Sequence, residues 1–289
     1  MCRAPLFPFQ DPSGVFETYN ANGPLDENNP FFQSLGTNGR SCATCHIPAN
    51  AFGLSAAHAE QIYRLTAGRD PLFAPVDGAA CPTPTADHPL NFDLLRGYGL
   101  IRIALPLPPN PQFTISAVHD PYGCALVTDP ESGIVTVSVY RRPLPATNLT
   151  FLTAVQFDGR ETVAPLNNAE TFAANLMTDL KHQALDAILV HAQASAAPTN
   201  AQLTQIVMFE AALNSAQAMD NQVGRLDRGG ADGGPRFLGT VGFFPGINDP
   251  LGGNPSGASF NSNAFTLYSK WENSPDSQRA SVARGEEIF

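Results

Sequence analysis

The sequence has few charged residues, little positive charge and no long apolar run. Charged residues make up 15% of the 289-residue chain, and 26 acidic residues outnumber 16 Lys and Arg, which gives a formal net charge of −10. Non-specific binding to nucleic acid or to an anionic membrane needs a basic surface, so we expect neither partner. No run of 18 or more apolar residues occurs, so we expect no helix that spans a bilayer.

Proline and glycine are abundant, with 26 and 24 residues, while 43% of the chain is hydrophobic. This hydrophobic fraction excludes wholesale disorder and predicts a globular protein with long irregular connections. Helical spacing of apolar residues predicts three helices, over 56–65, from Asn168 to just before Pro198, and over roughly 200–221. Two β-leaning runs, 112–119 and 134–140, predict a hairpin with a long connection.

Residues 42–46 read C-A-T-C-H, the C-x-x-C-H pattern that attaches haem c. Two thiols one helical turn apart can add to the two vinyl groups of one porphyrin, and the adjacent imidazole then lies under the iron as its proximal ligand. A redox-active dithiol would want a thioredoxin-like βαβ setting, and zinc would need a second pair of ligands nearby. Neither is visible, so the motif predicts one covalent haem c held by Cys42, Cys45 and His46.

Covalent haem also indicates a compartment, because it is installed outside the bacterial cytoplasm. We therefore expect a periplasmic or extracellular protein, although no apolar segment typical of a secretory signal peptide is visible. In an oxidising compartment Cys81 and Cys124 are candidates for one disulfide. Two unpaired buried thiols are an equal alternative, since the sequence does not give the distance between the two Cα atoms.

A second signature is F-D-G-R at residues 157–160. A C-x-x-C-H motif followed by W/F-D-G-R resembles the bacterial di-haem cytochrome c peroxidase superfamily, which includes the di-haem enzymes that mature methylamine dehydrogenase. Further stretches resemble one branch of it: 77–82 (D-G-A-A-C-P), 140–145 (Y-R-R-P-L-P), 191–193 (H-A-Q), 233–235 (G-G-P) and 283–289 (A-R-G-E-E-I-F). The last stretch resembles the opening of the superfamily's second haem domain.

The resemblance implies a mainly α fold, a cytochrome c-type haem domain with a β-hairpin insertion and long Gly/Pro-rich loops. The expected segments are an N-terminal arm (1–40), the haem domain (41–223) with its hairpin around 112–141, a Gly/Pro-rich loop and linker (224–276), and the start of a second cytochrome c domain (277–289). No second C-x-x-C-H occurs in the chain. A second haem domain is therefore expected outside it.

The function implied is that of a peroxidase-like oxidoreductase. It would reduce hydrogen peroxide, or carry out a related haem oxidation, with electrons from the second haem and from a small redox donor protein. The competing interpretation is an electron-transfer cytochrome subunit, whose iron is sealed on both faces by His or Met.

The superfamily's distal pocket pairs a Gln with a Glu after the D-G-R motif. Here Gln183 is present, but His191 and Gln193 occur where the Glu is expected, and Phe157 replaces the usual Trp. At 100° per residue the step from Leu180 to His191 turns about 1100°, which places His191 on an apolar helix face about 20° from Leu180. His191 is thus a candidate distal ligand or proton donor, or a core histidine bonded to a backbone carbonyl.

Asp158 and Arg160 have two interpretations, a structural ion pair or a brace for the haem pocket or a propionate. Four further arginines are candidate propionate partners that nothing in the sequence ranks: Arg40, Arg64, Arg141 and Arg142. Calcium is a further cofactor left open, because residues 248–250 (N-D-P) offer oxygen ligands without the spacing of an EF-hand.

Overall fold

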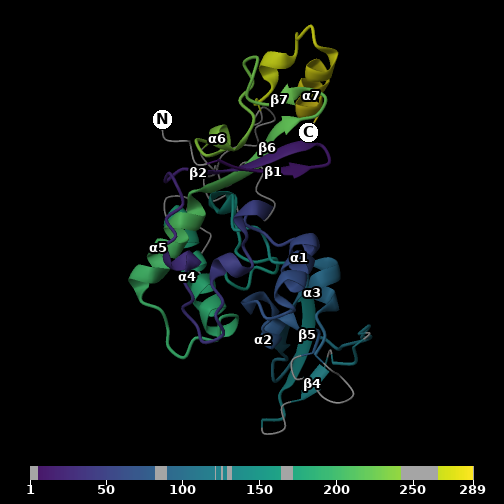
Figure 1. Cartoon of the computed structure of the whole chain (residues 1–289), viewed down its shortest axis with the longest axis vertical. Helices are drawn as coiled ribbons and strands as arrows, with labels where there is room; N and C mark the ends of the chain where they lie inside the picture. The colour runs from purple at the N-terminus through teal and green to yellow at the C-terminus, as the bar shows by residue number, and fades with distance from the viewer. Residues whose placement is uncertain are drawn as a thin grey trace. The chain divides into compact units, whose positions relative to one another are not determined.

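The computed structural model describes residues 6–81, 90–120, 122–124, 126–128, 132–163, 172–241 and 266–288. The chain forms two compact units (Figure 1). Unit 1 consists of Met1–Gln33, Ala146–Ile188 and Ala196–Phe289, and unit 2 of Ser34–Pro145 and Leu189–Ser195. The segment boundaries expected from the sequence stay a prediction, and each unit is described below by itself.

Unit 1 contains an antiparallel sheet whose described strands run in the order β1-β2-β6-β7. The strands are β1 (Leu6–Asp11), β2 (Gly14–Asn20), β6 (Leu213–Asp220) and β7 (Gly224–Arg225). The purple hairpin β1–β2 thus lies beside the green strand β6 (Figure 1), with Thr18 opposite Ser215 in the register. The two buried hydroxyl groups of this pair are 2.6 Å apart. The N-terminal arm is therefore part of a sheet.

Helix α5 (Asn200–Ala211) begins where the sequence predicts, but it ends about ten residues early. Its start is a capping box, in which Thr199 Oγ1 accepts from Gln202 N at 3.2 Å and Gln202 Oε1 accepts from Thr199 N at 2.9 Å. The chain then continues into β6, where a helix was expected to run to residue 221. The Ala, Gln and Met of β6 favour a helix locally, but the pairing with β2 decides.

The other helices of unit 1 surround two apolar clusters. Helix α4 spans Phe172–Val190, so its last two residues belong to unit 2, and α6 (Pro235–Leu238) and α7 (Ser277–Ile288) follow. Phe31 packs on Phe209 of α5, with ring centroids 4.9 Å apart. Near the C-terminus the buried Trp271 packs with Leu226 and Ala283. These contacts bury Phe209 of α5 and Ala283 of α7.

Unit 2 contains α1 (Ala56–Thr66), α2 (Pro75–Gly78) and α3 (Asp93–Tyr98), followed by a three-stranded antiparallel sheet of described order β3-β5-β4. Its strands are β3 (Ile101–Pro106), β4 (Leu126–Thr128) and β5 (Val135–Arg141). Helix α1 matches the helix expected over 56–65. The run 134–140 becomes β5, but 112–119 forms no strand, because β3 pairs with β5 along its whole length instead.

The core of unit 2 joins α1, α3 and β3 through buried Leu, Ile and Phe side chains: Ile47, Leu54, Leu72, Phe73, Phe92, Leu95 and Ile101. Cys81 and Cys124, the candidate pair of the sequence, form a disulfide with 5.6 Å between their Cα atoms. The bridge closes a loop over a sequence separation of 43 residues. It therefore ties the segment after α2 to the segment before β4.

The expected mainly α fold is wrong, because the described residues form two antiparallel sheets as well as helices. The protein has a mixed α/β fold. The error has a physical cause: β1 and β2 lie in a segment rich in Pro, Asn and Gly, and their partner β6 is about 200 residues away along the chain. A pairing over that distance leaves no periodic signal in either segment alone.

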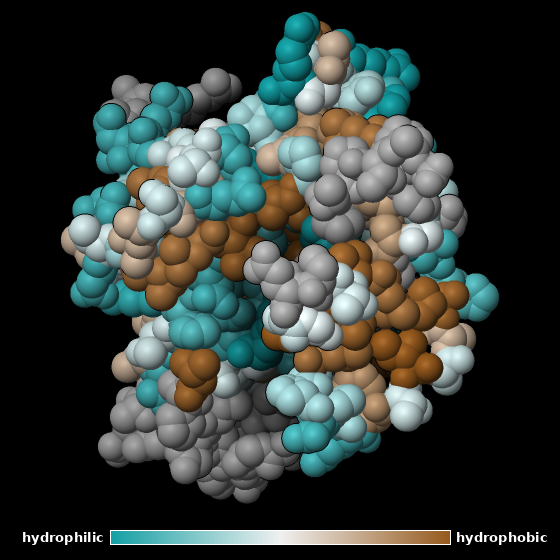
Figure 2. Space-filling model, turned by 90° about the horizontal axis from the view of Figure 1, so that it is seen from below, coloured by the Kyte–Doolittle hydropathy of each residue, from teal (hydrophilic) through white to brown (hydrophobic). Residues whose placement is uncertain are grey.

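None of the helices in the described ranges is long and apolar enough to cross a bilayer. Apolar surface is nevertheless exposed, and Figure 2 shows hydrophobic atoms, in brown, over much of the face turned to the viewer. In unit 2 some of the large exposed apolar side chains lie in or near β4 along the sequence: Phe113, Ile115, Val118, Leu126, Val127 and Ile134. The β-sheet of unit 2 thus leaves part of its apolar side chains outside the core.

Candidate functional site

The C-x-x-C-H motif folds into one turn of 3₁₀ helix, Cys42–Thr44, in unit 2. His46 N donates to Cys42 O at 2.9 Å, which closes the turn. Both cysteines are half-buried, and within the described residues they are not bridged to each other. Burial raises the pKa of the Cys45 thiol to about 11, so it stays protonated at neutral pH. The turn thus keeps Cys45 as a thiol, packed against the apolar core.

The loop after His46 folds back so that a backbone carbonyl meets the imidazole. Ile47 N donates to Gly53 O at 3.0 Å, and Phe52 N donates to Ile47 O at 3.0 Å. Ala51 and Phe52 both adopt left-handed backbone conformations, with φ of 53° and 57°. A non-glycine residue in this region costs about 1–3 kcal/mol, so the surrounding structure has to hold the turn in place. Its result is a contact of 3.0 Å between His46 Nδ1 and Phe52 O.

This contact orients the imidazole of His46. A carbonyl oxygen only accepts, so Nδ1 carries the proton in this contact. Burial lowers the pKa of His46, although hydrogen bonds with the Phe52 and Leu144 carbonyls act in the opposite direction. The nearby His191 lowers the pKa of His46 further, so the two imidazoles lie within electrostatic reach of each other. His46 is therefore held as a neutral imidazole with a defined orientation.

His191 lies one residue beyond the end of α4, so the helix face does not set its direction. A carboxylate sets this direction instead, because His191 Nδ1 lies 2.5 Å from Asp77 Oδ2. Asp77 is 3% exposed, whereas the His191 side chain is 34% exposed. With Nδ1 held on the buried carboxylate, Nε2 is the ring nitrogen left to meet a ligand or to move a proton. The structure thus pairs His191 with a carboxylate, where the sequence left open a core backbone carbonyl.

Arg40 holds the other oxygen of this carboxylate. Its Nη1 forms a buried ion pair with Asp77 Oδ1. Nε donates to Pro71 O at 2.8 Å and Nη2 to Leu72 O at 2.7 Å, so the guanidinium is anchored on backbone. Burial acts to raise the pKa of Asp77, but the hydrogen bond from His191 and the charge of Arg40 outweigh it, and the pKa lies below its ordinary value. Asp77 is therefore ionised and immobile at neutral pH.

The backbone around His191 is held as firmly as its side chain. Asn38 Nδ2 donates to His191 O at 2.8 Å, and Thr37 N donates to Ala192 O at 3.0 Å. A Cβ on Gly36 would lie 1.8 Å from Ala192 O, so only glycine allows the two segments to approach this closely. The segment before the C-x-x-C-H motif thus fixes both Arg40 and His191.

The other expected site residues belong to unit 1. Gln183 is half-buried on α4. Asp158 and Arg160 form a partly exposed ion pair, with Arg160 Nη1 3.3 Å from Asp158 Oδ2. Gly159, at φ 70°, makes the turn between them. This is the structural ion pair that the sequence allowed, and the adjacent Phe157 is 83% exposed.

Three of the four candidate propionate partners, all in unit 2, have other partners in the structure. Arg40 forms its ion pair with Asp77 and donates to backbone carbonyls. Arg64 pairs with Glu60 at 2.7 Å on the surface, and Arg142 donates to Tyr98 O at 2.7 Å. Residues 248–250, the calcium candidate, lie outside the described residues.

The residues of unit 2 fit a haem c. Metal-bound histidines almost always donate their second ring nitrogen to a carbonyl or carboxylate, and both His46 and His191 do so here. Sequence reasoning missed the partners. Asp77 and Arg40 carried no signal as a pair, because they come together only in the fold. The Phe52 carbonyl is a backbone group and has no signature in the sequence.

The comparisons with known proteins add no relative. No protein-family model matches the chain, and neither a curated protein nor a solved structure matches it. A function for this chain therefore has to be inferred from its sequence motifs and from the contacts of its site residues.

Proposed function

We propose that this chain binds one haem c through Cys42 and Cys45, with His46 as the proximal ligand, and acts as a peroxidase-like oxidoreductase. The observation that carries the proposal is the 3.0 Å contact between His46 Nδ1 and Phe52 O directly after a C-x-x-C pair. A histidine that ligates a metal is typically oriented by a contact of this kind from its other ring nitrogen. The resemblance to the di-haem cytochrome c peroxidase superfamily supports the same assignment.

Bound haem c supplies an iron that can exchange electrons with a peroxide. The chain's own residues then have distinct tasks. His46 would hold the iron through Nε2, on the side where Cys45 packs against the apolar core. His191 moves a proton at Nε2, since Asp77 holds Nδ1 and stabilises the imidazolium that forms. Electrons come from a redox donor, either a small protein or a second haem domain.

A second candidate function is an electron-transfer cytochrome. The observation that favours it is the closeness of His46 and His191, whose electrostatic coupling lowers the pKa of His46. If Nε2 of His191 were the sixth ligand, the iron would have no open position for peroxide. The two functions share the attachment chemistry and differ in the role of His191.

Attachment is tested by expressing Cys42→Ala and Cys45→Ala in a host that matures c-type cytochromes. Each variant should carry a single thioether or no haem, which haem staining of a denaturing gel and intact mass both report. Cys81→Ala/Cys124→Ala is the control, because it removes two cysteines of the same unit without leaving a free thiol and should keep the full haem stain. Full covalent haem in both test variants would refute the proposal.

The role of His191 is tested on the haem-loaded protein. A high-spin ferric spectrum that changes within seconds of adding peroxide supports the peroxidase, and His191→Ala should then slow this change without altering haem attachment. A low-spin spectrum that is inert to peroxide, and becomes high-spin in His191→Ala, supports the electron carrier. His182→Ala, in unit 1, is the control histidine and should leave both spectra unchanged.

A further inference from the structure

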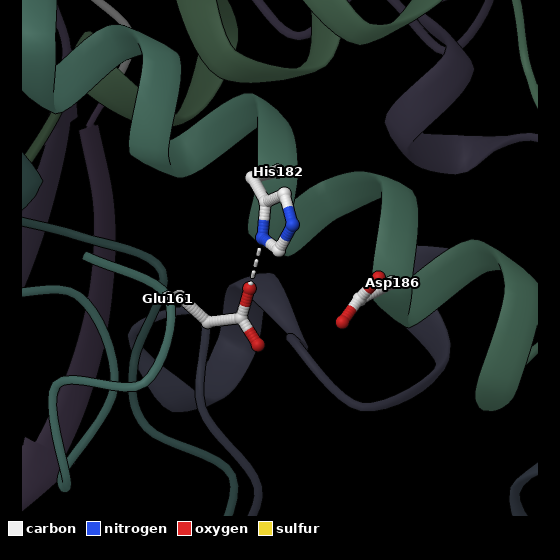
Figure 3. A group of neighbouring side chains, drawn as sticks. All are labelled: Glu161, His182 and Asp186. Carbon is white, nitrogen blue, oxygen red and sulfur yellow. Dashed lines mark hydrogen bonds and ion pairs between the residues drawn. The ribbon is translucent and has the colours of Figure 1, made fainter. Parts of the chain in front are cut away.

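Three potential metal ligands from two segments of unit 1 point toward one another (Figure 3). Glu161 follows the Asp-Gly-Arg turn, and His182 and Asp186 lie on α4, four residues apart and hence on one helix face. One ligand atom from each residue lies within 4.8 Å of the other two. His182 Nδ1 and Glu161 Oε2 already form a hydrogen bond of 2.7 Å. The geometry thus brings one nitrogen and two carboxylate donors together.

The donor set discriminates between metals. Calcium and magnesium take oxygen ligands almost exclusively, so a ring nitrogen in the set disfavours both. Zinc accepts imidazole nitrogen and carboxylate oxygen together, and two ligands spaced i, i+4 on a helix are a recurrent way to hold it. Because this set contains no thiolate, it belongs to the chemistry of a zinc site with oxygen and nitrogen ligands.

The electrostatics around His182 also favour a cation. The hydrogen bond to Glu161, together with the charges of Asp186 and Asp179, raises the pKa of His182. Arg160 opposes a cation, with Nε 3.5 Å from Glu161 Oε1, but its charge is shared with Asp158. Glu161 Oε2, which faces His182, is the oxygen turned away from Arg160. The local balance among these groups is therefore negative.

The side chains can close on a metal. Tetrahedral zinc at its usual bond lengths places donor atoms about 3.4 Å apart, so donor atoms now up to 4.8 Å apart need to approach by up to about 1.4 Å. The hydrogen bond of 2.7 Å between His182 Nδ1 and Glu161 Oε2 has to open to admit the metal. Glu161 is a fixed point, since its side chain is 6% exposed, whereas the His182 side chain is 44% exposed and Asp186 is also exposed. We propose that Glu161, His182 and Asp186 bind one Zn²⁺-type divalent cation. Three protein ligands leave a fourth position for water.

The site would tie the segment after the Asp-Gly-Arg turn to α4. The only contacts needed are the three ligands themselves, so the proposal is independent of the haem in unit 2. A cation that binds the folded chain but not the unfolded chain stabilises it by mass action. Zinc should therefore raise the melting temperature of the protein, and a chelator should reverse the rise.

The test is a metal titration of the purified protein after chelator treatment. Zn²⁺ is followed by calorimetry, and Co²⁺ by absorption, because Co²⁺ bound to thiolates gives an intense near-ultraviolet band that nitrogen and oxygen ligands do not give. The variants are Asp186→Asn and His182→Gln, which keep the size of each side chain. Glu27→Gln is the matched control, because it also removes one exposed carboxylate of unit 1.

Wild type and Glu27→Gln should bind one more equivalent of Zn²⁺ than either ligand variant, with no thiolate band in the Co²⁺ form. Each ligand variant should bind that equivalent at least about tenfold more weakly, since even second-shell partners cost about 10- to 100-fold. Equal stoichiometry and affinity in all four proteins would overturn the proposal. So would a thiolate band that accounts for all of the bound Co²⁺.

Discussion

Each unit contains a triad of the same three residue types, an arginine, a carboxylate and a histidine. In unit 2 the triad is Arg40, Asp77 and His191, and in unit 1 it is Arg160, Glu161 and His182. In both, histidine Nδ1 contacts the carboxylate, at 2.5 Å and 2.7 Å. Both carboxylates are buried. The arginines differ, since Arg40 is 3% exposed while the Arg160 side chain is 32% exposed.

The exposure of the arginine decides what the histidine can do. Arg40 donates to the backbone as well as to Asp77, so the carboxylate keeps its position and the imidazole has one orientation. Arg160 divides its charge between Asp158 and Glu161 at the surface, where water competes for it. The triad of unit 2 thus suits a preorganised catalytic or ligating histidine, and the more exposed triad of unit 1 suits the binding of a cation. This comparison can be tested at four places in the molecule.

Asp77→Asn should have the largest effect, because it leaves the buried Arg40 without its counter-charge. Removing one partner of a buried pair typically costs about 3–5 kcal/mol of unfolding free energy. Glu161→Gln is the counterpart in unit 1 and should cost less, since Arg160 keeps Asp158. Chemical denaturation of both variants measures the difference. Equal losses of unfolding free energy would show that the arginines do not distinguish the two triads.

Loss of the Cys81–Cys124 bridge should come next. A disulfide typically contributes about 2–4 kcal/mol by restricting the unfolded chain. The double variant Cys81→Ala/Cys124→Ala should therefore unfold at lower denaturant, and hydrogen exchange should speed up in β3 to β5 of unit 2. Unchanged exchange in that sheet, with faster exchange in β6 of unit 1, would contradict the assignment of the bridge to unit 2.

Glu210 of α5 shows what a buried carboxylate does without an arginine or a histidine. Burial raises its pKa to about 8, and Oε2 has no hydrogen-bond partner in the described part of the chain. The folded state then holds a proton that the unfolded state, with a pKa near 4.5, releases. Stability should therefore fall as the pH rises between these two values, by about 1.4 kcal/mol from pH 6 to pH 7.

Glu210→Gln should remove this fall, because an amide does not ionise. Unfolding free energies measured by urea denaturation at pH 6 and pH 7 give the comparison with wild type. Asp77→Asn is the contrasting variant, since the pKa of Asp77 is lowered and its ionisation is complete well below pH 6. A variant of Glu210 that keeps the full pH dependence of wild type would assign that dependence to another group.

The smallest effect is expected at the surface. Asp158→Asn removes the partner of Arg160, and both side chains are about one-third exposed. Such pairs contribute about 0–1 kcal/mol and are weakened by salt. Thermal unfolding at low and high salt should show a loss below about 1 kcal/mol that shrinks as salt is added. A loss of several kcal/mol would mean that the Asp-Gly-Arg turn braces more than its own ion pair.

Local parts of the fold could be predicted from the sequence. Helix α1 and the start of α5 follow from apolar spacing and from the Thr199–Gln202 capping box, whose contacts lie within one turn. The C-x-x-C-H turn is equally local, because its closing hydrogen bond joins Cys42 and His46. The sequence named Cys81 and Cys124 as a candidate disulfide pair, but it could not give the distance between their Cα atoms.

Other predictions from the sequence were wrong, because long-range contacts override the local preference of the residues. The sequence places His191 on a helix, but α4 ends at Val190, and the side chain is directed by a carboxylate 114 residues away. The expected helix over 200–221 becomes a helix and a strand, because β6 completes the sheet begun by β2. In both cases, residues that favour one structure locally are recruited by a partner that the local pattern does not contain.

Two thiols one turn apart, an adjacent imidazole and an excess of acidic side chains can all be identified from the sequence. The fold sets which of these groups are buried, how the His46 imidazole is oriented, and that Arg40, Asp77 and His191 form one network. The physical reason is range. Turns and caps form between neighbours along the chain, whereas burial and ion pairing depend on which distant segments pack together, and a carboxylate acquires its charge state only after that packing excludes water.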